Sequence, residues 1–187
     1  MKLHIDLDRI LIYMGCIMKK LLFLLVACLF ILCGCAEDAD PLAYQQGELF
    51  VSVDFSVDSK LYSADLFLSE IKEDKTRDVT ILFASPDDLD GISIKRTGGT
   101  SYLMLEDVEI PLLPAALSGF FDVTDAFSID GTLESVKTDK ETNTLRIISG
   151  SKSYTVTIDT KTREPRSIEA SVGGRTIKID IKKFVKN

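Results

Sequence analysis

Apolar and polar residues alternate along most of this chain from residue 48 onward. In the segment 49–57, every second position is Leu, Val or Phe, and most of the positions between them are Ser or Asp. Because successive side chains of a β-strand point to opposite faces of a sheet, this pattern predicts half-buried strands. We expect strands at 49–57, 62–69, 79–84, 92–96, 102–105, 108–112, 132–138, 144–149, 152–159, 166–172 and 175–184.

One segment departs from this alternation and predicts a helix at about 114–128. Pro114 suits a first helical turn, because the backbone N–H that proline lacks would have no intrahelical partner there. Four apolar residues of this segment fall near one helical face: Leu117, Phe120, Phe121 and Phe127. Their side chains would either pack in a core, the interpretation we favour, or plug an apolar groove.

Short turns such as Gly98-Gly99 and Gly173-Gly174 separate most of the predicted strands. Strands joined by tight turns pair antiparallel, whereas parallel pairing requires a long crossover. The sequence therefore predicts a mainly β (α+β) fold. Its centre is one large, curved antiparallel sheet of roughly ten strands with a helix packed on it.

The N-terminal part of the chain has a different pattern. Lys19 and Lys20 precede an apolar run, 21–32, of the length found in cleaved signal peptides. The sequence Leu32-Cys33-Gly34-Cys35 follows and resembles the lipobox of bacterial lipoproteins. The resemblance implies a signal peptide at 18–34, cleavage before Cys35, and a covalent diacylglycerol on the Cys35 thiol. Acyl chains would then anchor the protein to a bacterial membrane without any protein segment crossing it.

An uncleaved membrane-spanning helix and a buried core helix are the alternatives for this run. A span needs about 20 apolar residues, and this run is shorter and is followed directly by acidic residues. Residues 1–17 mix charged and apolar residues without a role in export, so we expect translation to start at Met18, with Met14 as the alternative. Residues 35–47 are polar and without a clear period, which predicts a short tether.

The positions of cysteine and histidine exclude the commonest hydrolase designs. All four cysteines lie at or before Cys35, and the only histidine is His4. The lipidated mature chain, 35–187, would therefore have neither a free thiol nor an imidazole. It could not build a Ser-His-Asp triad, a Cys-His pair or an ordinary zinc site. We expect a protein that is not an enzyme, with no metal and no cofactor besides the diacylglycerol on Cys35.

Two short motifs resemble known sites but fit better as turns. The stretch 88–91, Asp-Leu-Asp-Gly, is similar to part of a calcium loop, but Pro86 and Thr97 stand where an EF-hand has Asp and Glu. The stretch 149–152, Ser-Gly-Ser-Lys, matches the Ser-x-x-Lys motif of penicillin-binding enzymes. That motif begins a helix, whereas here it straddles a predicted turn.

The mature chain would be acidic, with 18 basic and 27 acidic side chains and a net charge of −9. Such a charge offers no binding footprint for nucleic acid. It is divided unevenly: residues 36–134 have a net charge of −15 and residues 135–187 one of +6. The two segments could attract each other across the fold or present faces of opposite sign to a partner. We favour solvated strand faces of both signs.

Four stretches of the predicted β region carry a resemblance: Tyr62-x-Ala64-x-Leu66, Leu82-Phe83-Ala84-Ser85-Pro86, Gly91-Ile92-x-Ile94, and Ile158-Asp159-Thr160 with Pro165. They resemble the LolA/LolB family, carriers and receptors for bacterial lipoproteins. The likeness covers most of residues 48–184 and implies an unclosed β-barrel with helices lying against its concave face. In the family an amphipathic helix precedes the first strand, and here only 41–47 fills that place.

This resemblance implies a membrane-anchored, extracytoplasmic lipoprotein with a non-catalytic domain, 48–187, that binds acyl chains or lipoproteins in the cell envelope. The alternative is a protein–protein adaptor that docks or activates a cell-envelope or spore-cortex enzyme, as lipidated proteins of this fold class do in spore germination. The candidate groove residues are equally good core residues. They are Val51, Val53, Phe55, Tyr62, Leu66, Ile81, Phe83, Leu117, Phe120 and Phe121.

Overall fold

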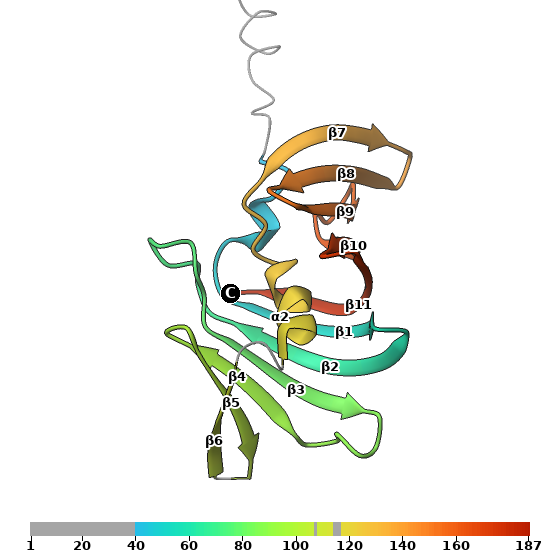
Figure 1. The fold of residues 1–187 in the computed structure, drawn as a ribbon. Helices are drawn as coiled ribbons and strands as arrows, with labels where there is room; N and C mark the ends of the chain where they lie inside the picture. The colour runs from blue at the N-terminus through green and yellow to red at the C-terminus, as the bar shows by residue number, and fades with distance from the viewer. Residues whose placement is uncertain (1–39, 107, 114–116) are drawn as a thin grey trace, which may run out of the picture. The chain divides into compact units, whose positions relative to one another are not determined.

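Eleven strands form one antiparallel sheet in the part of the chain that the structure describes (Figure 1). The structure is a computed structural model and describes residues 40–106, 108–113 and 117–187. The predicted signal peptide, the translation start, Cys35 and the first turn of the predicted helix lie outside these residues. The strands are β1 (Leu49–Val57), β2 (Lys60–Leu68), β3 (Val79–Ser85), β4 (Ser93–Thr97), β5 (Thr100–Leu105), β6 (Val108–Leu112), β7 (Thr132–Thr138), β8 (Thr142–Ser149), β9 (Lys152–Asp159), β10 (Pro165–Val172) and β11 (Arg175–Lys186).

The order of the strands across the sheet is β6-β5-β4-β3-β2-β1-β11-β10-β9-β8-β7. Every neighbouring pair is also consecutive in the chain except β1 and β11, which join the first strand to the last. The sheet curves around the helix, and its two edge strands, β6 and β7, are not paired with each other (Figure 1). The predicted fold class, a mainly β unclosed sheet with one helix on its concave face, is confirmed.

The strand boundaries follow the alternation closely. Strand β2 begins at Lys60, two positions before the predicted start, because Asp58 and Ser59 alone form the turn after β1. Both turn residues have positive φ angles, 50° and 66°. A two-residue turn of this kind matches the twist of the flanking strands and keeps the hairpin paired up to the turn.

The helix α2 (Ser118–Asp125) ends three residues before the predicted end at about 128. At its C-terminal end the backbone N–H groups of Phe127 and Ser128 donate to the carbonyl oxygens three residues earlier. Hydrogen bonds of this spacing tighten the chain into a turn and end the α-helix. Phe127 thus lies after the helix, but it is fully buried in the core, as its apolar character predicted.

The core lies between the concave face of the sheet and α2. Strand β1 shows the predicted pattern in full, with its five odd-numbered residues buried and the residues between them partly exposed. Each fully buried side chain of this size stabilises the fold by about 1.5–3 kcal/mol relative to an exposed one. The fully buried set of large side chains is Phe55, Phe127, Leu66, Ile81, Leu145, Ile147, Ile168, Ile177, Ile179, Val51, Val53 and Val79.

Residues 35–47 were expected to form a tether, and their described part, 40–47, packs against the sheet. Residues Ala43–Gln45 form a short 3₁₀ helix, η1, in which Tyr44 and Gln45 are buried. The Tyr44 ring meets Phe184 of β11 edge to face, with ring centroids 6.3 Å apart. Tyr44 therefore belongs to the same hydrophobic core as the strands. No helix within the described residues is long and apolar enough to cross a membrane.

Candidate functional site

The ten predicted groove residues lie together in the interface between the sheet and α2. Seven of them are buried, and the other three, Tyr62, Leu117 and Phe120, are partly buried against the same core. The side chains of this set therefore fill the space that an acyl chain would need.

Phe120 is the residue by which α2 closes this interface. Its ring projects from the helix among three rings of the sheet, Phe55 of β1, Tyr62 of β2 and Phe83 of β3. The ring centroids of Tyr62 and Phe83 each lie 5.2 Å from that of Phe120, in edge-to-face geometry. Such pairs contribute about 0.5–1.5 kcal/mol each beyond the area that they bury. Phe120 thus fills an aromatic socket, which consists of the rings of Phe55, Tyr62 and Phe83.

An apolar row crosses six strands on the concave face. Val51 of β1 lies opposite Leu66 of β2, and the row continues across β3, β4, β5 and β6. The first three members are fully buried, whereas Ile110 at the edge of the sheet is 38% exposed. The apolar surface of the core thus runs out from under α2 to the edge strand β6. Its members in order are Val51, Leu66, Ile81, Ile94, Leu103 and Ile110.

A buried arginine, Arg77, clamps three segments next to this interface. Its guanidinium donates to the backbone carbonyl oxygens of Gln45 at 2.8 Å, Gly47 at 3.0 Å and Phe127 at 3.3 Å. Within the described residues it has no carboxylate partner. Burial lowers the pKa of Arg77 to about 10, so it stays positively charged at neutral pH.

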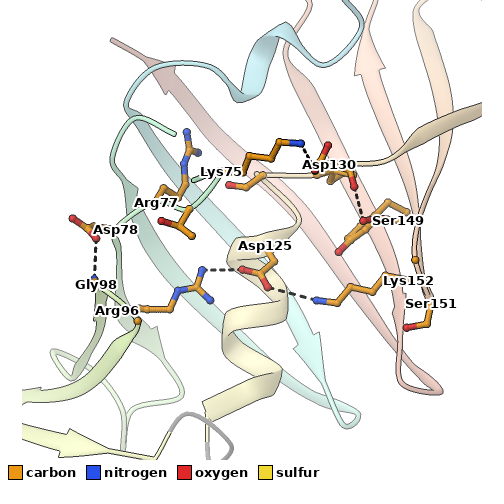
Figure 2. Close-up of a pocket in the computed structure, with 16 residues that line it drawn as sticks. Lys75, Arg77, Asp78, Arg96, Gly98, Asp125, Asp130, Ser149, Ser151 and Lys152 are labelled. Atoms are coloured by element: carbon orange, nitrogen blue, oxygen red, sulfur yellow. Dashed lines mark hydrogen bonds and ion pairs between the residues drawn. The ribbon is translucent and has the colours of Figure 1, made fainter. Parts of the chain in front are cut away.

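The C-terminal end of α2 is held by ion pairs to both halves of the sheet. Figure 2 shows the Asp125 carboxylate between Arg96 of β4 and Lys152 of β9, at 2.8 Å and 3.5 Å. Lys152 also pairs with Asp122 of the helix at 3.2 Å. Because β4 and β9 lie on opposite sides of the central pair β1–β11, these contacts tie the two halves together through the helix.

A cavity of about 600 Å³ opens at this end of α2 (Figure 2). Both halves of the sheet contribute to it, through the β2–β3 loop, the β4–β5 turn and the β8–β9 turn. Its charged lining consists of four basic residues and three acidic ones: Lys75, Arg77, Arg96 and Lys152, and Asp78, Asp125 and Asp130. The volume is within the range of pockets for small ligands.

The described residues offer little for acid–base or metal chemistry. No group of three or more His, Cys, Asp or Glu side chains in this part of the chain is placed to hold a metal ion. Tyr154 lines the cavity, but burial raises the pKa of its hydroxyl, so the group is uncharged at neutral pH.

The sequence reasoning did not single out Arg77, Arg96 or Asp125, and it named Lys152 only as part of the Ser-x-x-Lys match. Arg77 ends an acidic loop just before an apolar strand, a position where a basic residue is usually solvated. The two motifs judged to be turns lie in turns: Asp88–Gly91 between β3 and β4, and Gly150-Ser151 between β8 and β9. The second turn nevertheless lines the cavity, which the motif comparison had not indicated.

Solved structures with a similar fold include proteins related to lipoprotein sorting. An uncharacterized conserved protein from Thermus thermophilus aligns with 79% of this chain and 84% of its own length, at 13% identity and a TM-score of 0.46. A LolA superfamily protein from Nitrosomonas europaea aligns with 76% of this chain and 87% of its own length, at 11% identity and a TM-score of 0.41.

A third similar structure is a domain of an outer membrane lipoprotein-sorting protein from Vibrio parahaemolyticus. It aligns with 80% of this chain and 90% of its own length, at 10% identity and a TM-score of 0.42. No protein-family model and no curated protein matches the sequence.

Proposed function

We propose that this protein is a lipid-anchored, extracytoplasmic lipoprotein whose domain is non-catalytic and binds an acyl chain, either of a free lipid or of another lipoprotein. The observation that carries the proposal is the apolar row on the concave face. It joins the core under α2 to exposed side chains at the sheet edge, where Ile110 is 38% exposed and Val108 is 59% exposed. An acyl chain lying along the row would bury this surface, at ~0.8 kcal/mol per CH₂ group removed from water.

The helix α2 supplies a way to admit more of the ligand. It has only eight residues, and three of them, Phe120, Phe121 and Val123, are its apolar contribution to the core. If Phe120 left its aromatic socket, the acyl chain would take over the contacts with Phe55, Tyr62 and Phe83. The groove set predicted from the sequence would then line the ligand, and the interface would stay packed with or without it.

Copurification tests the ligand. The full chain, expressed in a bacterium and purified in mild detergent, is analysed by native mass spectrometry, and the masses released are identified by lipid analysis. The proposal expects a noncovalent acyl-bearing molecule in addition to the covalent modification on Cys35. A protein that carries only its covalent lipid and that takes up no fatty-acid probe would contradict acyl binding.

A separate experiment tests the anchor. Metabolic labelling with an alkyne analogue of palmitate should tag the wild-type protein and a Cys28→Ala variant, and both should sediment with membranes. A Cys35→Ala variant should lose the tag and leave the membrane fraction. If that variant stayed membrane-bound, a lipid on Cys35 would not be the anchor.

The open edges of the sheet favour a second candidate function, docking to a protein partner in the cell envelope. All seven residues of β7 are exposed, and one side of its backbone has no strand beside it in the described residues. An edge of this kind can pair with an extended segment of another chain. If the wild-type protein captures one specific envelope protein and the Val136→Pro variant, in which this edge is blocked, does not, the adaptor function is supported. Capture that Val136→Pro leaves unchanged would exclude β7 as the docking edge.

A further inference from the structure

We infer that the cavity at the C-terminal end of α2 binds the phosphate of an anionic phospholipid headgroup. This headgroup site rests on the proposed binding of an acyl chain along the apolar row. The cavity, its charges and its position relative to the row carry this inference.

The charges that line the cavity do not cancel. Each acidic residue of the lining has a cation beside it: Lys72 pairs with Asp78, Lys75 with Asp130, and Arg96 with Asp125. Lys152, which also contacts Asp125, has a second carboxylate in Asp122 of the helix. The charge that remains is that of Arg77, which is 4% exposed and hydrogen-bonded to backbone carbonyl oxygens alone within the described residues.

An unbalanced buried cation attracts an anion strongly, because the low dielectric of the interior screens its charge poorly. The lining therefore favours a ligand with one negative charge over a neutral or positively charged one. This preference is opposite to that expected from the overall charge of the chain, which is −7. It is a local property of the cavity that composition does not reveal.

The cavity also has hydroxyl groups that a phosphate oxygen can use. Ser128 and Ser151 line the cavity, whereas the hydroxyls of Ser149 and Thr76, which also line it, donate to the backbone carbonyl oxygen of Asp130 and to the carboxylate of Asp74. The Ser128 hydroxyl is buried and has no hydrogen-bond partner among the described residues. A buried donor without a partner costs about 1–3 kcal/mol, so a ligand oxygen that accepts from it would gain that free energy.

The cavity lies beside the apolar row. Arg96 follows Ile94 by two residues on β4, so both side chains are on the concave face, and their Cα atoms are about 7 Å apart along the strand. From Ile94 the row continues through Leu103 to Ile110 at the exposed edge. A phospholipid with its phosphate in this cavity, which Arg77 and Arg96 both line, would thus have its acyl chain pointing over β5 and β6, where the row is open.

A binding series on the full chain tests the inference. The protein in nonionic detergent is titrated with phosphatidylglycerol, phosphatidylcholine and diacylglycerol of identical acyl chains, and bound lipid is counted by native mass spectrometry. We expect phosphatidylglycerol to bind roughly tenfold more tightly than diacylglycerol, with the zwitterion between them. The preference should shrink as salt is added.

Charge variants in opposite directions separate the site from a general loss of folding. Arg96→Gln should reduce the preference for phosphatidylglycerol several-fold, whereas Asp125→Asn, which removes a negative charge from the lining, should increase it. Destabilisation alone cannot produce the increase. Lys161→Gln removes the same charge as Arg96→Gln from an exposed turn outside the cavity and should leave the preference unchanged.

The outcomes distinguish this inference from the proposed function. Equal binding of all three lipids, or no effect of either charge variant, overturns the headgroup site and leaves acyl binding in place. If no lipid binds but glycerol phosphate does, and Arg96→Gln weakens it, the cavity is a site for a free phosphate and the lipid part is overturned. If neither lipid nor glycerol phosphate binds, both proposals fail.

Discussion

The guanidinium nitrogen Nη2 of Arg77 lies 2.8 Å from the backbone carbonyl oxygen of Gln45, and this contact joins segments 32 residues apart in the chain. The same side chain reaches the carbonyl of Phe127 after α2. One buried cation therefore holds the N-terminal η1 segment, the start of β3 and the segment that follows the helix. Backbone carbonyls at such segment ends would otherwise be buried without donors.

Replacing Arg77 with Met should destabilise the domain by roughly 3 kcal/mol or more, since it leaves three carbonyl oxygens without their donor. Urea unfolding followed by circular dichroism measures the change. Arg146→Met is the matched control, because the ion pair of Arg146 with Glu134, at 2.8 Å, is exposed to solvent. That substitution should change the free energy of unfolding by less than about 1 kcal/mol. Equal effects of the two variants would argue against the clamp.

Gly119→Ala should destabilise the domain although alanine is the better helix former. A Cβ on Gly119 would lie 2.7 Å from Cγ1 of Val57, closer than two carbon atoms can approach. Overpacking of this kind costs typically about 1–3 kcal/mol, more than the ~1 kcal/mol of helix propensity gained.

A double-mutant cycle isolates that contact. In a Val57→Ala background the space for the new methyl group exists, so Gly119→Ala should there be neutral or stabilising. Thermal unfolding of the four proteins in the cycle gives the coupling. Stabilisation by Gly119→Ala in the wild-type background would show that the helix moves freely away from β1.

Acid should weaken the turn between β9 and β10. The backbone N–H of Thr162, the Arg166 side chain and the backbone N–H of Lys161 hold the pKa of Asp159 at about 2, below its usual 3.8. A carboxyl group whose pKa is lower in the folded state stabilises the fold above its unfolded pKa, and this stabilisation is lost as pH falls. We expect the loss between about pH 4 and pH 2.

Carbon-13 NMR of the Asp159 carboxyl group tests this directly. In an Arg166→Met variant its pKa should rise, but only part of the way to 3.8, because the N–H of Thr162 is the larger cause. An Asp159→Asn variant should lose stability less steeply in the same pH interval. A carboxyl group titrating near 3.8 in the wild type would contradict the assigned hydrogen bonds.

Two apolar residues of nearly equal exposure test the apolar row. Ile110 is 38% exposed on the concave face, and Leu82 is 36% exposed on the opposite face of the sheet. Ile110→Asp places a charge beside the proposed acyl chain and should weaken binding of a fluorescent fatty acid at least tenfold. Leu82→Asp should leave binding unchanged, since its side chain points away from the row. Equal losses of fatty-acid binding in the two variants would show that the fatty acid does not lie along the apolar row.

The local alternation of apolar and polar residues was enough to predict the strands. Val51, Val53 and Phe55 alternate with polar residues, and the structure buries them as the pattern requires. The N-terminal segment was less predictable. Tyr44 and Gln45 lie in a polar stretch without a period, and they are buried only because Phe184 and Arg77, distant in sequence, meet them.

The amino-acid sequence by itself determined the kind of fold and the absence of histidine and cysteine from residues 36–187, because periodicity and residue type are local properties. It also assigned the seven groove candidates in strands to the apolar faces of those strands, since strand alternation assigns faces without knowledge of the partner strands. Only the tertiary structure decided that Phe120 fills the socket between those residues, and that Arg96, Asp125 and Lys152 meet at one cavity. These contacts join residues from different elements, and their geometry depends on the curvature of the whole sheet.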